Sequence, residues 1–155
     1  PGALEFLAKK ENLDFAQVLD ILNQESGVLG ISKNFSSDFR ELKDAEIKYN
    51  DQAALAREIF AYRVAKYVGS YAAAMNGVDN IVFTAGVGEN DSDIRMEICS
   101  YLEYLGITID EVKNRDEAEA FRISDGMSRV NVLVIKTNEE LEIAREAAEV
   151  ARMYH

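Results

Sequence analysis

The stretch from Asp79 to Asn90 constrains the fold of this chain more than any other part of it. It contains Ile81-Val82-Phe83-Thr84, a short run of β-branched and aromatic residues that predicts a buried strand. The chain continues as Ala85-Gly86-Val87-Gly88-Glu89-Asn90, and a helical pattern begins at Ser92 or Asp93. Two glycines directly after a strand allow a sharp turn and leave no Cβ in the way of a ligand. Ligands of open α/β sheets bind beyond the carboxyl ends of strands, so the pattern predicts either a nucleotide-binding turn or one that only redirects the chain.

The turn does not match either of two common phosphate-binding motifs. The dinucleotide-binding fingerprint requires a third glycine three positions after the second, where this chain has Asp91. The P-loop requires a lysine after its glycine-rich spacer, and no lysine occurs between Lys66 and Lys113. A nucleotide at this turn would therefore be held in another way.

Residues 84–90, followed by Ile94-Arg95, closely resemble the nucleotide-site loop of the acetate kinases. These enzymes belong to the superfamily of sugar kinases, actin and Hsp70-type ATPases. Further matching segments occur in the family's order at residues 25–32, 36–40, 62–71 and 137–141. The resemblance covers nearly the whole chain and implies that it is the C-terminal portion of such an enzyme.

The expected fold class is α/β, with parallel strands and flanking helices. Buried strands are predicted at 81–84 and 130–135, with a third candidate at 117–124, and a long helix at 51–75 precedes them. The resemblance implies the C-terminal part of an actin-like (ribonuclease H-like) ATPase domain. On that basis residues 1–48 form a helical segment near the nucleotide, residues 49–155 form the α/β core, and the N-terminal domain is absent.

The first fifty residues show helical patterns at 3–10 and 14–23, with Asp14 as a candidate cap of the second. Gly27 and Gly30 predict a turn around Val28-Leu29. Ser36 or Ser37 is expected to cap a short helix that runs through Leu42.

Asp38-Phe39-Arg40 lies at the start of that helix. Taken alone, the segment indicates a capping acid and a solvated arginine. The resemblance implies instead that it lies beside the nucleotide, where an arginine can stack on adenine or meet a phosphate and an aspartate can accept from ribose hydroxyls. The nucleotide-binding residues that the resemblance implies are Asp38, Phe39, Arg40, Gly86, Val87, Gly88, Glu89 and Asn90.

Thr137-Asn138-Glu139-Glu140 precedes the last helical pattern, which runs from Asn138 to about Arg152. Thr137 as N-cap and Glu140 three residues later predict a capping box, which leaves Glu139 without a necessary local role. The resemblance implies that Glu139 contacts the Mg²⁺ ion of the nucleotide through water. Magnesium keeps several waters and takes few protein carboxylates, so one glutamate suffices.

The implied activity is the reversible, ATP-dependent phosphorylation of acetate to acetyl phosphate. The resemblance places the catalytic residues and the acetate site in the missing N-terminal part, so no catalytic residue is expected here and the chain alone should be inactive. Propionate kinase, butyrate kinase and a non-catalytic nucleotide-binding or structural module remain alternatives. Ala85 stands where many family members have glycine, and its methyl group should narrow the loop slightly.

Charge and composition exclude other classes of partner. The formal net charge of −11 disfavours nucleic acid and anionic membranes, and no apolar run has the length of a membrane span. The single cysteine, Cys99, falls in a helical pattern as a buried spacer rather than a nucleophile, and it fits the reducing cytoplasm. His155, the last residue, is assigned no role. The resemblance implies a homodimer, with the apolar face of helix 51–75 as the expected contact.

Overall fold

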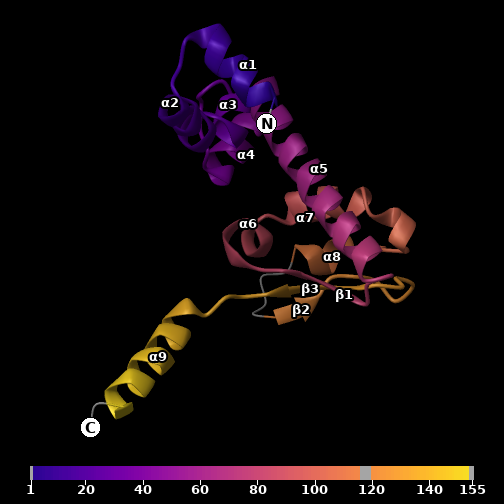
Figure 1. The fold of residues 1–155 in the computed structure, drawn as a ribbon. Helices are drawn as coiled ribbons and strands as arrows, with labels where there is room; N and C mark the ends of the chain where they lie inside the picture. The colour runs from indigo at the N-terminus through magenta and orange to yellow at the C-terminus, as the bar shows by residue number, and fades with distance from the viewer. Residues whose placement is uncertain (1, 116–119, 154–155) are drawn as a thin grey trace. The chain divides into compact units, whose positions relative to one another are not determined.

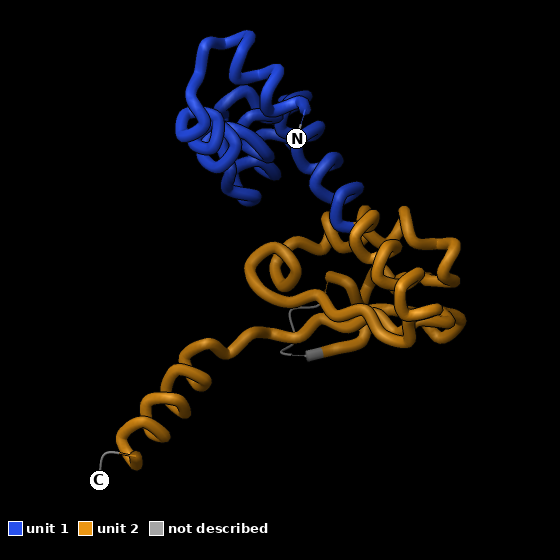
Figure 2. Tube along the Cα trace, in the orientation of Figure 1, with its two compact units in different colours: residues 1–64 blue, residues 65–155 orange. Residues whose placement is uncertain are grey.

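A computed structural model describes residues 2–115 and 120–153 of the chain. It divides into two compact units, residues 1–64 and residues 65–155, which are coloured separately in Figure 2 and described separately below. The division lies inside the long helix. The sequence-based boundary between residues 48 and 49 concerned proximity to a nucleotide, and it stays a prediction.

The described residues of unit 1 form helices and the turns that connect them. Its elements are α1 (Gly2–Glu11), α2 (Phe15–Asp20), the π-helical turn η1 (Ile21–Glu25), α3 (Gly27–Ile31), α4 (Phe39–Ile47) and the first part of α5 (Asp51–Ala74). Its small core contains Leu42, Ala45 and Ala53, against which Val28 packs.

The predicted turn around Val28-Leu29 is wrong, because Gly27 and Gly30 lie in the short helix α3. Gly27 begins that helix with a left-handed φ of 61°. At Gly30 a Cβ atom would lie 2.7 Å from the carbonyl oxygen of Glu25, so close backbone approach requires the glycine. The prediction for Asp14 is confirmed: its carboxylate caps α2 in a capping box with Gln17.

Unit 2 contains a three-stranded sheet with helices (Figure 1). After the end of α5 come β1 (Asn80–Phe83), α6 (Ala85–Asn90), α7 (Ser92–Ser100), the 3₁₀ turn η2 (Glu103–Leu105), α8 (Glu111–Asn114), β2 (Ala120–Arg122), β3 (Asn131–Ile135) and α9 (Glu139–Met153). The strand order is β1-β3-β2. The α/β class and the parallel pairing of β1 with β3 are confirmed, but β2 is antiparallel to β3. Residues 117–119 of the third predicted strand lie outside the described residues.

The register of the parallel pair determines which later segments meet. Ile81 pairs with Val132 and Phe83 with Val134, and all four side chains are buried on one face of the sheet. The carboxyl ends of β1 and β3 therefore lie side by side. Consequently the residues that follow β1, which form α6, are neighbours of the turn between β3 and α9.

Helix α5 buries the predicted apolar stripe only in part: Ile59, Phe60, Val64 and Val68 are partly buried. The residues with little exposure are mostly small: Ala53, Ala56, Ala61, Ala65 and Ala72. Among the larger predicted apolar residues, Leu55 and Tyr71 are exposed. The predicted end at Asn76-Gly77 is confirmed, since the Gly77 amide donates to the Ala72 carbonyl at 2.8 Å. None of the described helices has both the length and the apolarity required to cross a membrane.

Candidate functional site

A hollow of about 420 Å³ lies in unit 2 at the carboxyl ends of β1 and β3. Residues from α6 and from the β3–α9 turn line it together: Ala85, Gly86, Glu89, Thr137, Asn138, Glu139 and Glu140. The structure thus brings part of the predicted nucleotide loop together with Glu139, the predicted magnesium contact. This is also the place where open α/β sheets bind ligands.

The predicted glycine-rich turn is a short helix, α6, and its sharp bend does not use the glycines. Ala85 takes the left-handed conformation, with a φ of 58°, while Gly86 and Gly88 do not lie in that region. The prediction that the two glycines allow the sharp turn is therefore wrong. Glycine would adopt the Ala85 conformation without the Cβ strain that alanine carries.

The surroundings of the two glycines differ. A Cβ atom on Gly86 would meet no other atom within 4 Å, so Gly86 presents bare backbone to open space at the hollow. A Cβ atom on Gly88 would lie 3.4 Å from the carbonyl carbon of Phe83, within the chain. The prediction that a glycine leaves no Cβ in the way of a ligand therefore applies to Gly86 and not to Gly88.

Glu89 is the polar centre of the hollow. Its Oε1 atom accepts hydrogen bonds from the Ala85 amide at 2.6 Å, the Thr137 amide at 2.8 Å and the Thr137 hydroxyl at 2.7 Å. The Thr84 hydroxyl lies 3.5 Å from the same oxygen. The hydrogen bonds from Thr137 are the main cause that lowers the pKa of the Glu89 carboxyl, so it is an anion at neutral pH.

The predicted capping box at Thr137 and Glu140 is wrong. The side chain of Asn138 caps α9 instead, because its Oδ1 accepts from the Leu141 amide at 3.0 Å. Thr137 is engaged elsewhere: its hydroxyl contacts Glu89, the Ala85 amide at 3.1 Å and the Thr84 hydroxyl at 2.9 Å. The first turn of α9 carries Glu139, which has no role in the cap and lines the hollow.

The buried side chain of Arg95 holds α6 in place through hydrogen bonds to its backbone. Arg95 of α7 donates to the carbonyl oxygens of Gly88 at 2.9 Å and Glu89 at 2.8 Å, and to the side-chain oxygen of Asn114 at 2.8 Å. It also donates to the Asn114 carbonyl. Arg95 was recognised from the sequence only as part of a matching segment. Its role depends on Asn114, nineteen residues away, which no local pattern indicates.

The other predicted residues of the loop have structural contacts. The side-chain amide of Asn90 donates to the Gly86 carbonyl at 2.8 Å and closes α6 on itself. Val87 is partly buried. Neither observation tests a contact with a nucleotide.

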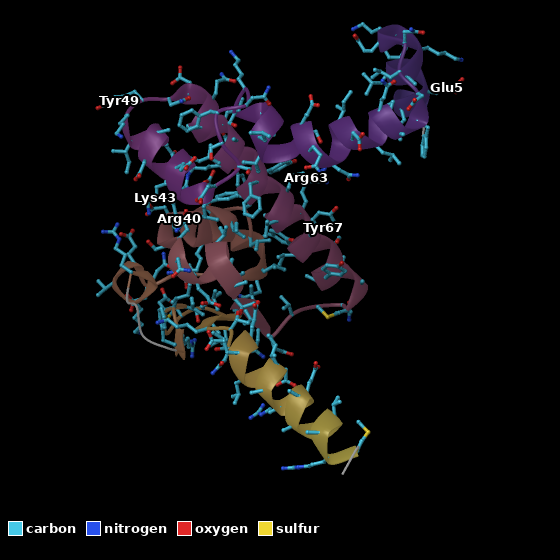
Figure 3. All side chains as sticks on the ribbon, turned by 90° about the vertical axis from the view of Figure 1, so that its left-hand side faces the viewer. Glu5, Arg40, Lys43, Tyr49, Arg63 and Tyr67 are labelled. Atoms are coloured by element: carbon cyan, nitrogen blue, oxygen red, sulfur yellow. The ribbon has the colours of Figure 1, made fainter. Side chains whose placement is uncertain are left out.

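Asp38, Phe39 and Arg40 belong to unit 1. Asp38, rather than Ser36 or Ser37, caps α4, because its carboxylate accepts from the Arg40 amide at 2.8 Å. The Arg40 guanidinium also donates to Asp38, at 2.7 Å, and mainly through this contact lowers the pKa of that carboxyl to about 2. The Arg40 side chain is 90% exposed. It is labelled in Figure 3.

Phe39 packs its ring against Phe60 at a centroid distance of 4.5 Å. The three residues of the Asp-Phe-Arg segment thus have local structural roles. Because the hollow lies in unit 2, the meeting of this segment with the hollow in one nucleotide site stays a prediction.

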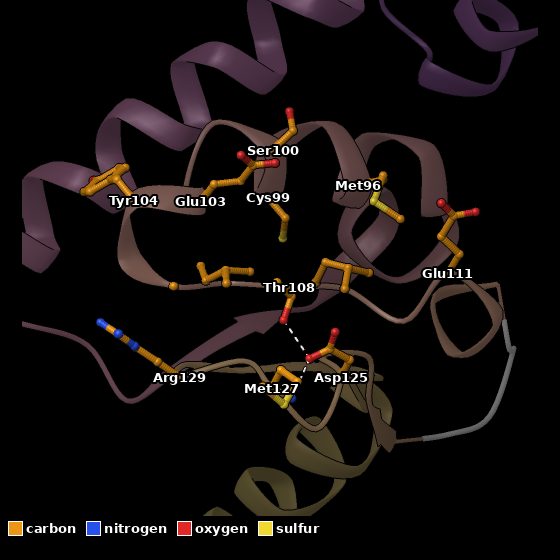
Figure 4. A pocket seen from close by; sticks show the side chains of 13 residues that line it. Met96, Cys99, Ser100, Glu103, Tyr104, Thr108, Glu111, Asp125, Met127 and Arg129 are labelled. Carbon is orange, nitrogen blue, oxygen red and sulfur yellow. Dashed lines mark hydrogen bonds between the residues drawn. The ribbon is translucent and has the colours of Figure 1, made fainter.

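A larger hollow, of about 870 Å³, lies elsewhere in unit 2 between α7 and the 125–129 turn (Figure 4). Cys99, which is 2% exposed, lies at its edge, and burial raises the pKa of the thiol to about 12. The Thr108 hydroxyl donates to Asp125 across this hollow at 2.6 Å. Cys99 is therefore a buried spacer, as predicted. None of the residues with predicted nucleotide contacts lines this hollow.

Among the described residues, no group of three or more His, Cys, Asp or Glu side chains converges as a metal site. A metal ion at the smaller hollow would have to be held by few protein ligands. Glu139 and Glu140 offer carboxylate oxygens there, the hard donors that Mg²⁺ prefers. The donor chemistry therefore fits a magnesium ion that takes its remaining ligands from phosphate and water.

Comparison with known proteins gives a consistent result. Residues 1–145 match the model of the acetokinase family. The chain is 55% identical over 150 residues to the acetate kinase of Carboxydothermus hydrogenoformans and 52% identical over 152 residues to that of Thermotoga maritima. These alignments cover 97% of this chain but only 37% and 38% of the relatives.

Solved structures show the same pattern. The crystal structure of Porphyromonas gingivalis acetate kinase superposes with a TM-score of 0.88 at 43% identity, over 97% of this chain and 38% of that one. A propionate kinase from Francisella tularensis superposes with a TM-score of 0.84 at 40% identity, over 94% and 37%. The expected actin-like ATPase fold is confirmed by this likeness to acetate kinases.

Proposed function

The chain belongs to the acetokinase family, and on that premise we propose that its parent protein is an acetate kinase. This enzyme would transfer the γ-phosphoryl group of ATP to acetate, reversibly, and release acetyl phosphate and ADP. The observation that carries the proposal is the hollow at the ends of β1 and β3, which bare backbone at Gly86 and the acidic residue Glu139 line together. The acetate kinases among the relatives support the choice of substrate.

Within this proposal the chain provides part of the nucleotide site. Gly86, Val87, Gly88 and Asn90 are the proposed nucleotide contacts on α6, and of these Gly86 lines the hollow. Gly86 allows close approach, and the Asn90–Gly86 and Arg95 hydrogen bonds keep α6 rigid.

Asp38, Phe39 and Arg40 of unit 1 are further proposed nucleotide contacts. The Arg40 guanidinium is suited to stacking on adenine or pairing with a phosphate. Its exposure supports this role.

Glu139 is the proposed contact of a magnesium ion, and the oxygen donors around it suit that ion. Bound there, magnesium would neutralise charge on the phosphate oxygens during transfer. Glu139 would orient the water molecules of the ion. Asn138 caps α9 and so leaves the Glu139 carboxylate available for this role.

The groups that face the transferring phosphoryl are proposed to lie outside this chain, which spans about 37–38% of the length of its relatives. Phosphoryl transfer needs positive charge around the moving group, and a single arginine can change the rate by about 10³–10⁵. We therefore propose that residues 1–155 alone produce no acetyl phosphate.

The same proposal includes a cytoplasmic homodimer. A reduced, buried Cys99 supports a reducing compartment. The exposed apolar residues of α5, among them Leu55 and Tyr71, support an interface on that helix.

The test is an assay of the whole protein in which hydroxylamine traps the acyl phosphate formed from ATP, Mg²⁺ and acetate. The proposal predicts hydroxamate formation that requires magnesium, and its loss when only residues 1–155 are supplied. Absence of hydroxamate from the well-folded whole protein would refute it. Product from residues 1–155 alone would show that the catalytic groups lie within this chain.

Propionate kinase is the second candidate, because the Francisella tularensis enzyme superposes on 94% of this chain. The hydroxamate assay separates the two when acetate and propionate compete at equal concentration. A higher kcat/KM for propionate would favour this candidate over acetate kinase.

A further inference from the structure

We propose that Glu89 is a positioning residue: it holds the turn that carries Glu139 against α6, and so acts on the metal through Thr137. The inference deepens the proposed function and rests on it, since it assumes a magnesium ion at Glu139. It assigns to Glu89 a role different from the direct nucleotide contact implied by the sequence resemblance.

The hydrogen bonds of Glu89 connect two segments that are far apart in the sequence. Its Oε1 atom accepts from the amide and the hydroxyl of Thr137, 48 residues away, at 2.8 and 2.7 Å. The same oxygen accepts from the Ala85 amide at 2.6 Å. One carboxylate oxygen therefore joins the first residue of α6 to the β3–α9 turn.

The protons of this cluster are consistent with an ionised Glu89. Each threonine hydroxyl has one proton to donate. When Thr137 donates to Glu89, the hydroxyl of Thr84 can donate to Thr137 across the 2.9 Å contact. Thr137 then also accepts from the Ala85 amide at 3.1 Å. A carboxylate that accepts several such bonds forms a stronger connection than neutral groups would.

The position of Glu139 depends on this connection because α9 has little other support. The helix contains no buried residue, so packing of α9 within unit 2 does little to fix its first turn. Glu139 follows Thr137 by two residues, and Asn138 between them forms the cap. Any displacement of Thr137 therefore displaces the Glu139 carboxylate within the hollow.

The geometry also explains why Glu89 should not bind the nucleotide through its Oε1 atom. That oxygen already accepts from three groups within 2.8 Å. A nucleotide hydroxyl would have to displace one of them, with the loss of a charged hydrogen bond.

The experiment uses the whole protein with the substitutions Glu89→Ala, Thr137→Val and Thr137→Ser. Binding of Mn²⁺, as a probe for magnesium, is measured by electron paramagnetic resonance with ADP present. Binding of ADP without metal is measured separately by calorimetry in EDTA. Groups that orient metal ligands typically contribute 10–100-fold to metal affinity, so Glu89→Ala and Thr137→Val should weaken Mn²⁺ binding about 10-fold or more. Thr137→Ser, which retains the hydroxyl, should bind Mn²⁺ as the wild type does, and metal-free ADP binding should stay unchanged in all three.

Two results would overturn the inference. Unchanged Mn²⁺ affinity in both Glu89→Ala, which removes every hydrogen bond between Glu89 and Thr137, and Thr137→Val would show that the connection does not position Glu139, whatever the effect on thermal stability. Weaker metal-free ADP binding in Glu89→Ala alone would show that Glu89 contacts the nucleotide directly. The variant Glu139→Gln separates this failure from that of the proposed function. If Glu139→Gln binds Mn²⁺ normally, the metal role of Glu139 is wrong. If Glu139→Gln loses Mn²⁺ while Glu89→Ala and Thr137→Val do not, only the positioning role of Glu89 is wrong.

Discussion

Replacing Gly86 with alanine should stabilise the protein and weaken nucleotide binding at the same time. Gly86 lies within α6, its φ is not left-handed, and a Cβ atom there would meet nothing within 4 Å. Alanine is favoured over glycine in a helix by roughly 0.5–1 kcal/mol, because glycine loses more backbone freedom on folding. The substitution should therefore raise the free energy of unfolding by about that amount.

The effect on the ligand should have the opposite sign. If the nucleotide lies against bare backbone at Gly86, the added methyl group occupies its space. Overpacking of this kind typically costs about 1–3 kcal/mol. The dissociation constant for ADP should then rise by a factor of roughly 5–150, since each 1.4 kcal/mol is tenfold.

The assay combines thermal unfolding without ligand and calorimetric titration of ADP with magnesium, both on the whole protein. Gly126→Ala is the matched control, because a Cβ atom on Gly126 also meets nothing within 4 Å but the residue does not line the hollow. It should leave ADP binding unchanged. Wild-type affinity for ADP in Gly86→Ala would refute the claim that the nucleotide passes over this residue. A loss of stability would refute the conformational part of the reasoning.

Three further predictions concern single side chains. Arg95→Lys should lower the free energy of unfolding, measured by urea denaturation, by about 3 kcal/mol. A lysine cannot replace the forked contacts of Arg95 with Asn114 and α6, so buried acceptors are left unpaired. A change below about 0.5 kcal/mol would contradict this reasoning. The folded-state pKa of Asp38, about 2, lies below its ordinary value of 3.8. The Asp38–Arg40 contact should therefore stabilise the protein above about pH 4 and lose its effect as the pH falls toward 2. Asp38→Asn should flatten that part of the pH–stability profile, and an unchanged slope would argue against the contact. Cys99, with a pKa of about 12 and 2% exposure, should react with a disulfide reagent at pH 8 only after unfolding in urea, whereas rapid native labelling would contradict its burial.

Local sequence patterns correctly predicted two of the strands and the end of the long helix. The buried run at 81–84 and the apolar run at 130–135 form β1 and β3, and the Asn76-Gly77 pair ends α5. The parallel pairing of the two strands followed from the strand–loop–helix order. From the sequence, Glu139 and the glycine-rich segment were linked only through the family resemblance, and the structure brings them together at one end of the sheet.

The errors have a common physical cause, which is competition between local signals and contacts distant in the sequence. Thr137 and Asn138 are both good helix caps, and Thr137 loses that role because Glu89 engages it from 48 residues away. The bend after β1 lies at Ala85, although two glycines follow directly. From the sequence, the Ala85 methyl group was expected only to narrow the loop, and no local pattern indicated a left-handed conformation there.

The burial of α5 is a further example in which a local pattern predicted the structure only in part. Spacing predicted a buried stripe of large apolar residues, but the most buried residues are mostly alanines. Four residues of the stripe are partly buried, and Leu55, Tyr71 and Met75 are exposed. Because α5 carries apolar residues on several faces, the sequence alone does not determine which of them are buried.

Hydrogen exchange measured by mass spectrometry on the whole protein, with and without ADP and magnesium, tests the central claim most directly. The ligand should slow amide exchange in peptides that cover residues 84–90 and 137–141, because these segments line the smaller hollow. Peptides that cover residues 96–109 and 125–129, around the larger hollow, should be unaffected and serve as the internal control. Protection confined to the larger hollow, with none at 84–90 or 137–141, would contradict the assignment of the nucleotide site.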